Sequence, residues 1–111
     1  MAAACARFFR DHDVLLCPIT PTAAIPHDHR PDVDARRIVV NGRERPYGDQ
    51  IPWASLPGLC SLPAVVVPVG LTREGLPVGL QVIAPFLEDR TAINVAQRIG
   101  GLIGPLVPPA W

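Results

Sequence analysis

Two apolar runs late in the chain, at residues 64–69 and 78–84, dominate its hydrophobic pattern. The first, AVVVPV, contains no polar residue, and the second, VGLQVIA, contains only Gln81. Runs of this kind are typical of strands covered on both faces, as in the middle of an α/β sheet. Only the short linker 71–77 separates them, whereas a parallel crossover needs about a dozen residues. The pattern therefore predicts an antiparallel hairpin, with Gly75 at a positive φ in its solvated turn.

Helical periodicity marks both ends of the chain. Apolar side chains recur at helical spacing within residues 2–12 and predict a short helix there. A longer apolar face extends from Ala92 to Ile103 and predicts a second helix that ends near Gly100 and Gly101. The tail at 104–111 is interpreted as a capping or linking segment.

The first half of the chain alternates short apolar runs with loops. Residues 14–17 are apolar and are followed by Pro18, which indicates a short buried strand. Residues 19–36 combine proline with mixed charge and predict a long surface loop. The pair Asn41–Gly42 lies between a β-branched run and a polar one, which predicts a small hairpin with a type I′ turn.

Residues 49–60 carry two prolines in an otherwise apolar segment. We interpret them as an irregular helix that starts near Pro52 and is broken near Pro57, since proline is tolerated only in the first helical turn. Pro68 cannot donate a backbone hydrogen bond either, so strand pairing should lapse beside it.

Composition narrows the class of protein. The 111 residues allow one domain at most, and ten basic residues balance ten acidic ones. No basic patch favours nucleic acid, and no apolar run approaches the length that spans a membrane. The three cysteines are an odd, scattered number, which favours free buried thiols over a disulfide framework. With no recognisable targeting segment, we expect a soluble cytoplasmic protein.

Nucleophilic chemistry has few candidates. All ten basic residues are arginine, so no mechanism that uses lysine is available within this sequence. Ser55 and Ser61 are the only serines, and neither lies in a Gly-x-Ser-x-Gly turn. A Ser-His-acid triad is geometrically open, but no spacing favours it. Cys17 and Cys60 lie in apolar runs, which raise a thiol pKa and make it inert.

A metal site could be built from His27, Asp28 and His29 together with His12 or Cys17, because the two loop histidines share one side of an extended chain. The competing interpretation is a solvated loop, and it is favoured because structural zinc sites show clearer ligand pairs. We therefore expect neither a metal nor an organic cofactor.

Trp53 lies in an apolar segment just before the first long strand. Core packing is its most frequent role, and contact with a ligand in a pocket wall is the alternative. The sheet itself is the larger anomaly. Too few helices are available to cover its strands, and Val65, Val67, Leu80 and Val82 should need a covering surface that this chain lacks. The sequence is typical of one side of a larger sheet.

Several motifs resemble the C-terminal portion of the amidase signature family. They are the strings LPA at 62–64, PVGL at 68–71 and LPVGLQ at 76–81, a turn at Ala84–Pro85, and Asp13, Pro18 and Pro21 in HDVLLCPITP. The resemblance covers nearly the whole chain. One departure precedes the LPA string, where Gly58 and Ser61 stand in a turn that many members build from asparagine and glycine.

The resemblance implies a single partial domain over residues 1–111, an α/β fold with a partial mixed sheet and flanking helices. The family hydrolyses carboxamides with two serines and a lysine, which lie N-terminal to the matching region. No catalytic residue can therefore be transferred to this sequence, no cofactor is implied, and Trp53 is the best candidate for a substrate pocket wall. A truncated or split amidase, inactive by itself, would explain the chain.

The resemblance also implies a partner, either an N-terminal amidase segment or a second copy of this chain. The alternative is a non-catalytic binding or assembly module that pairs its exposed sheet edge with another protein.

Overall fold

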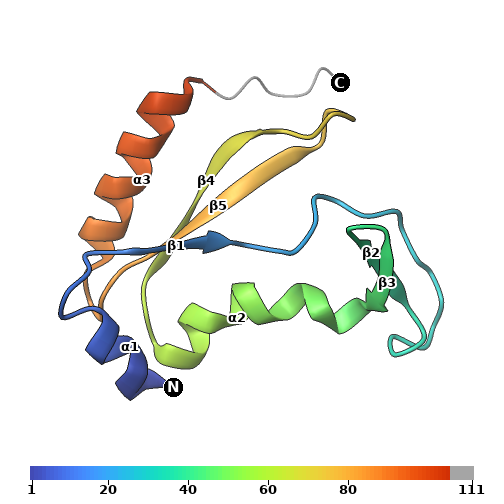
Figure 1. The fold of residues 1–111 in the computed structure, drawn as a ribbon, viewed down its shortest axis with the longest axis horizontal. Helices are drawn as coiled ribbons and strands as arrows, with labels where there is room; N and C mark the ends of the chain where they lie inside the picture. The colour runs from blue at the N-terminus through green and yellow to red at the C-terminus, as the bar shows by residue number, and fades with distance from the viewer. Residues whose placement is uncertain (106–111) are drawn as a thin grey trace.

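The computed structural model describes residues 1–105, so the predicted tail lies almost wholly outside them. An α/β arrangement with two small sheets and flanking helices confirms the predicted fold class (Figure 1). Residues 19–36 contain no helix or strand. In chain order the elements are α1 (Ala2–Phe8), β1 (Leu15–Pro18), β2 (Arg37–Val40), β3 (Arg43–Pro46), the 3₁₀ turn η1 (Tyr47–Gln50), α2 (Ile51–Cys60), β4 (Ala64–Leu71), β5 (Pro77–Ile83) and α3 (Asp89–Ile103).

The predicted late hairpin is confirmed, because β4 and β5 pair antiparallel. Its turn is closed by a hydrogen bond from the backbone N–H of Thr72 to the carbonyl oxygen of Leu76, 2.8 Å long. Gly75 has φ +81° in this turn, as its position required. The register shifts between Pro68 and Gly70, so the pairing lapses beside the proline as expected.

The strand predicted at 14–17 forms as β1 and pairs antiparallel with the free edge of β5. The larger sheet therefore has the order β1-β5-β4, with the last long strand in the middle. Leu16 and Val65 both lie opposite Val82, one on each side of it. Both outer strands have an edge that no described strand covers.

Helix α3 covers one face of this sheet over β4 and β5 (Figure 1). Val67 and Val82 are buried there against Ala96, and Val65 and Leu80 pack around them. The prediction that these four side chains lack a covering surface within the chain is wrong. The amphipathic face of α3 supplies that surface, because its small Ala96 lets the helix approach the strands closely.

Helices α1 and α2 lie on the opposite side of the sheet from α3 (Figure 1). Gln81 and Ile83 are buried on this side. The cover is incomplete on both faces, since Leu16 is 48% exposed on β1 and Val66 is 49% exposed on β4. The uncovered apolar surface that the sequence predicted is therefore present, but it belongs to Leu16 and Val66 on the outer strands.

Helix α2 runs through Pro57 without a break, so the predicted interruption is wrong. A proline has no N–H for the carbonyl four residues earlier, which here belongs to Trp53. The side-chain Nε2 of Gln81 donates a hydrogen bond of 3.1 Å to that carbonyl oxygen. Gln81 on β5 thus supplies the hydrogen bond that Pro57 cannot donate. The helix therefore continues, and the same bond links it to the sheet.

Two helix ends also differ from the prediction. Helix α1 ends at Phe8, not at residue 12, and the ring nitrogen Nδ1 of His12 lies 3.1 Å from the Phe8 carbonyl oxygen. Helix α3 passes through Gly100 and ends at Ile103, before Gly104 with φ +94°. A side chain at Gly100 would touch Val67, so this glycine serves close packing and does not end the helix.

The predicted hairpin around Asn41 and Gly42 is confirmed as the antiparallel pair β2–β3. Both turn residues have positive φ, at 51° and 75°, as a type I′ turn requires. This second sheet lies at the far end of the molecule from α3 (Figure 1). Ile38 is its only buried residue among those that the structure describes.

The fold is more open than its length requires. Its radius of gyration is 16.0 Å, whereas a compact domain of this length has about 13 Å. Its accessible surface of 8219 Å² exceeds the roughly 5,900 Å² expected of a folded monomer of this mass. No helix in residues 1–105 is long and apolar enough to cross a bilayer.

Candidate functional site

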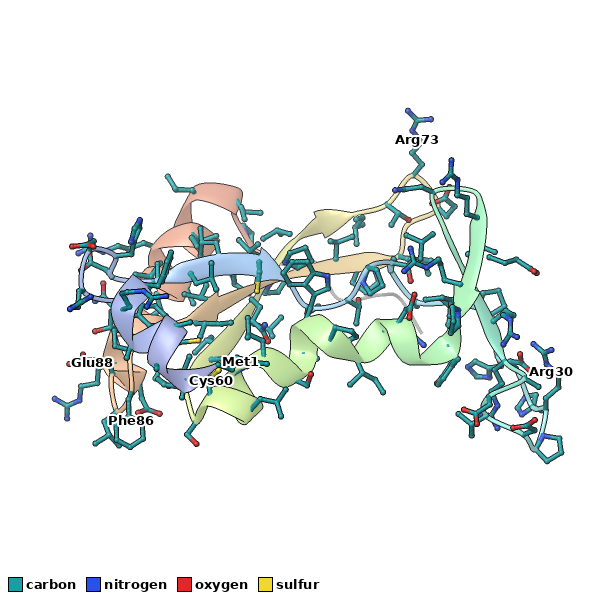
Figure 2. The ribbon with its side chains drawn as sticks, turned by 60° about the horizontal axis from the view of Figure 1, so that its bottom comes forward. Met1, Arg30, Cys60, Arg73, Phe86 and Glu88 are labelled. Carbon is teal, nitrogen blue, oxygen red and sulfur yellow. The ribbon has the colours of Figure 1, made fainter. Side chains whose placement is uncertain are left out.

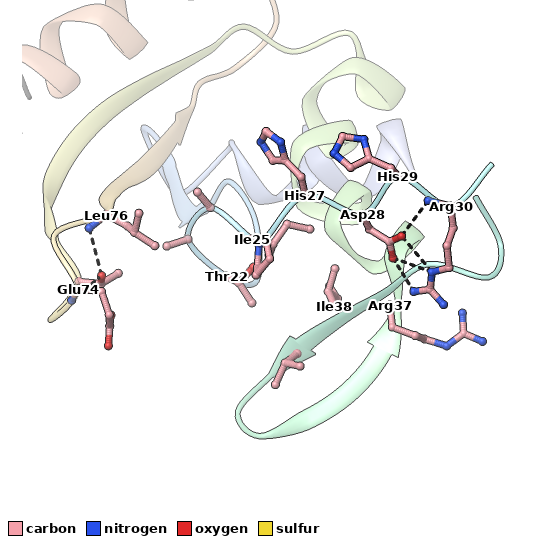
Figure 3. A pocket seen from close by; sticks show the side chains of 15 residues that line it. Thr22, Ile25, His27, Asp28, His29, Arg30, Arg37, Ile38, Glu74 and Leu76 are labelled. Atoms are coloured by element: carbon pink, nitrogen blue, oxygen red, sulfur yellow. Dashed lines mark hydrogen bonds and ion pairs between the residues drawn. The ribbon is translucent and has the colours of Figure 1, made fainter. Parts of the chain in front are cut away.

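A groove with a volume of about 840 Å³ lies between the long loop and the β2–β3 hairpin (Figure 3). Three segments line it: loop residues 22–30, residues 37–39 of β2, and the turn between β4 and β5. Aliphatic side chains from each segment, Ile25, Ile38 and Leu76, form its apolar lining. A volume of this size suits a small organic ligand.

Charged groups lie at the loop side of the groove. Nε of Arg30 donates to both carboxylate oxygens of Asp28, at 3.0 Å each, and the backbone N–H of Arg30 donates to Oδ1 at 3.1 Å (Figure 3). The hydrogen bonds from Arg30 hold the pKa of Asp28 well below its usual range. Asp28 is therefore an ionised partner of Arg30 and is not free to act as a general acid.

The turn side of the groove carries Glu74. The hydroxyl oxygen of Thr72 accepts hydrogen bonds from the backbone N–H groups of Glu74 and Leu76, at 3.2 and 3.3 Å. Hydrogen bonding to Thr72 lowers the pKa of the exposed Glu74 carboxyl. The turn that separates the two long strands thus reverses the chain and also presents one carboxylate to the groove.

The metal hypothesis is not favoured by this arrangement. The rings of His27 and His29 stand nearly perpendicular, with centroids 5.8 Å apart, while Asp28 is occupied by Arg30. His12 stacks on Phe8 at the N-terminal end. Within residues 1–105, no group of three or more His, Cys, Asp or Glu side chains could hold a metal ion.

Neither serine has the surroundings of a nucleophile. The hydroxyl of Ser55 donates to the carbonyl oxygen of Pro52 at 3.2 Å, within α2. Ser61 ends that helix in the left-handed conformation, with φ +53°. No histidine bonds to either serine among the described residues, so no Ser–His pair is assembled there.

Trp53 lies in the first turns of α2 and is 43% exposed. It is therefore not a core residue, which removes the interpretation that the sequence favoured. It does not line the large groove, so its role as a pocket wall stays a prediction.

The groove itself was missed by sequence reasoning. Its walls come from the loop and β2, which are close in the sequence, and from the turn between β4 and β5, more than thirty residues further along the chain. Thr22 is the most informative of them, because its hydroxyl is buried without a hydrogen-bond partner in the structure. A threonine between apolar loop residues gives no signal of this kind in the sequence.

Known structures define the class of this fold. A structure described as a crystal structure of an amidase matches with a TM-score of 0.75 at 22% identity, over 92% of this chain and 22% of that one. A second matches with a TM-score of 0.73 at 25% identity, over 93% of this chain and 21% of that one. It is described as a vestigial protein complex that reveals the evolutionary origins of an s-triazine catabolic enzyme. The chain thus has the fold of part of an amidase.

Sequence comparison gives the family. The Amidase family model matches residues 1–93. The chain is 38% identical over 106 residues to a glutamyl-tRNA(Gln) amidotransferase subunit of Salinispora tropica, covering 92% of this chain and 18% of that protein. It is 31% identical over 104 residues to the corresponding subunit of Brucella ovis, covering 94% of this chain and 20% of that protein. The chain belongs to the Amidase family and spans about a fifth of the length of these curated relatives.

Proposed function

We propose that this chain is a partial domain that completes an amidase signature hydrolase. The complete enzyme would cleave a carboxamide to a carboxylate and an amine or ammonia, with no metal or organic cofactor. Its nucleophile and base would come from a segment corresponding to the N-terminal part of the relatives. The chain itself would supply part of the sheet and one wall of the substrate pocket.

One observation carries this proposal: the chain has the fold of part of a family member but too much accessible surface for its mass. Its accessible area of 8219 Å² is about 2,300 Å² above the roughly 5,900 Å² of a compact monomer. Excess area of that order equals a large stable interface. The uncovered edges of β1 and β4, with Leu16 and Val66 beside them, are where a further part of the sheet would pack.

The test is complementation. The chain is co-expressed with the N-terminal part of a related amidase, and release of ammonia or amine is followed on a panel of aryl and aliphatic carboxamides. We expect hydrolysis only from the mixture, together with a gain in solubility of the chain. A compact monomer that melts cooperatively and ignores the amidase segment would contradict the proposal.

A matched pair of variants locates the docking surface. Val66→Asp places a charge on the uncovered part of β4 and should abolish complementation, because the carboxylate would be buried without a partner. Gln97→Asp places the same charge on an exposed position of α3 and should leave complementation intact. Equal loss in both variants would show that the β4 surface is not the one that docks.

We also propose that Trp53 forms part of the substrate pocket wall. Its side chain is large, half-exposed and carried by the helix that Gln81 fastens to the sheet. In the complemented enzyme, Trp53→Ala should raise KM about tenfold with little change in kcat, the signature of lost uniform binding. Trp53→Phe should recover most of that loss, since it restores an aromatic surface.

The uncovered sheet edges also favour a second candidate, a non-catalytic module that adds its edge to another protein or to a second copy of itself. Sedimentation of the chain distinguishes the two. A stable dimer without any gain from the amidase segment would support the module. For either function we propose the cytoplasm as the compartment, because the three free thiols suit a reducing environment.

A further inference from the structure

Two cysteines from distant parts of the sequence meet where α1 packs on the end of α2. The Sγ atoms of Cys5 and Cys60 lie 3.3 Å apart, although 55 residues separate them along the chain. Cys60 lies at the last turn of α2, beside the N-terminal helix (Figure 2). Both thiols are free. A disulfide bond is about 2.05 Å long, so the two sulfurs need to approach by only a little over an ångström.

The surroundings permit that approach. An apolar cavity of about 210 Å³ separates α1 from α2 and β5, and Cys5 is one of its lining residues. Helix α1 has only seven residues and none of them is buried. Such a short helix is held weakly by its own hydrogen bonds, so it can shift into the cavity.

The two thiols differ in access to solvent. Cys60 is only 7% exposed, whereas Cys5 lies at intermediate depth. The hydrogen bond with Cys5, and then burial, raise the pKa of the Cys60 thiol. An oxidant in solution therefore reaches Cys5 first. Cys17, 5% exposed and contacted by Nε2 of Gln81 at 3.4 Å, lies apart from this pair.

We propose that Cys5 and Cys60 are a redox-sensitive pair that hydrogen peroxide converts to a disulfide, which locks α1 onto α2. In the first step the Cys5 sulfur attacks the peroxide O–O bond, giving a sulfenic acid and one water. In the second step the Cys60 sulfur displaces hydroxide from that sulfenic acid, forming the S–S bond and a second water. The peroxide accepts the two electrons, and a dithiol such as dithiothreitol reverses the change.

The proposal predicts selective pairing. The native chain is treated with excess hydrogen peroxide, remaining thiols are alkylated, and the protein is digested with trypsin. The three thiols fall on separate peptides, residues 1–7, 11–36 and 44–73. We expect a cross-link between the first and the last peptide, with Cys17 alkylated. The same treatment in denaturant should give mixed pairings, because contact between the thiols then depends on chance encounters.

A second readout is thermal stability. The cross-link closes a long loop and should raise Tm by about 10 °C, reversibly on reduction. Cys5→Ser and Cys60→Ser should each abolish the shift, while Cys17→Ser should keep it. Pairing of Cys17 with either partner, equal pairings in native and denatured samples, or over-oxidation of Cys5 without a cross-link would each overturn the proposal.

Discussion

Two regions of the molecule differ in how far their side chains are buried. One is the three-stranded sheet with α3, and the other runs from the long loop through the β2–β3 hairpin. In the first, Val82, Ile83 and Ala92 are completely buried, and strand and helix cover one another. In the second, every residue of β3 is exposed and Ile38 alone is buried. The first region has a core, while the second supplies two of the three segments that line the groove. Apolar patterning therefore gives this molecule its buried core, whereas the groove takes most of its lining from segments with almost no core.

The largest effect on stability is expected from truncating a buried isoleucine in the sheet, and the same change in the hairpin tests whether the two regions differ. Ile83→Ala removes a fully buried side chain beneath the sheet and should lower the free energy of unfolding by about 4 kcal/mol. Ile38→Ala makes the same change in the hairpin, where the side chain is 2% exposed. It should change global unfolding by less than about 0.5 kcal/mol, because the hairpin opens locally without the sheet.

Chemical denaturation of both variants measures the change in the free energy of global unfolding. Amide hydrogen exchange measures local opening of the hairpin. Ile38→Ala should accelerate exchange within residues 37–46 only. A global loss equal to that of Ile83→Ala would show that both regions unfold as one cooperative unit.

The next effect concerns the link between the regions. Gln81→Leu leaves the carbonyl oxygen of Trp53 without a donor and should cost about 2 kcal/mol. In a Pro57→Ala background the helix regains an N–H for that carbonyl, so the same substitution should cost only about 1 kcal/mol. A double-mutant cycle by urea denaturation gives the coupling. Additive costs would mean that Gln81 does not compensate for Pro57.

A smaller effect tests how tightly the strands pack. A Cβ at Gly79 would lie 2.8 Å from Cγ1 of Val66, so Gly79→Ala should destabilise the sheet by about 1 kcal/mol. Gly101→Ala in α3 is the control, since its Cβ would meet nothing within 4 Å. It should stabilise by about 0.5 kcal/mol through helix propensity. Melting temperatures that shift in the same direction would contradict this contrast.

The smallest effect on stability is expected at the groove. Arg30→Gln removes the charged donor that lowers the Asp28 pKa, so this pKa should rise toward its ordinary value. Stability should hardly change, because an exposed pair is screened by solvent and salt. Any contribution of Asp28 is present at neutral pH and is lost as the pH falls below about 4 and through the depressed pKa. NMR titration of the carboxyl carbon measures this. An unchanged pKa would show that Arg30 does not control Asp28.

Sequence reasoning recovered the parts of the fold that local rules determine. The short linker and Gly75 predicted the β4–β5 hairpin, and Asn41–Gly42 predicted the other one. The break at Pro57 was a wrong prediction, since the compensating amide of Gln81 lies 28 residues from the carbonyl that it satisfies. Periodicity gave α3 but not the exact packing that buries Val67 beneath it.

The candidate site was predictable only in part. The absence of a Ser–Lys constellation was predictable from the sequence, because it needs a lysine and the sequence contains none. The groove could not be read, because its walls depend on how a loop without helix or strand folds over Ile38. Trp53 was given a core role by its residue type, whereas its exposed place on α2 depends on tertiary packing.

The central place of β5 has a consequence for how the chain is made. A ribosome synthesises β1 long before it reaches residues 77–83, yet β1 has no other pairing partner in the described sheet. The carbonyl oxygen of Trp53 likewise has no side-chain donor until Gln81 has been synthesised. Strand β1 therefore leaves the exit tunnel with its backbone groups hydrogen-bonded only to water. Such dependence on distant contacts slows folding, so pauses in translation before β5 should prolong exposure to chaperones.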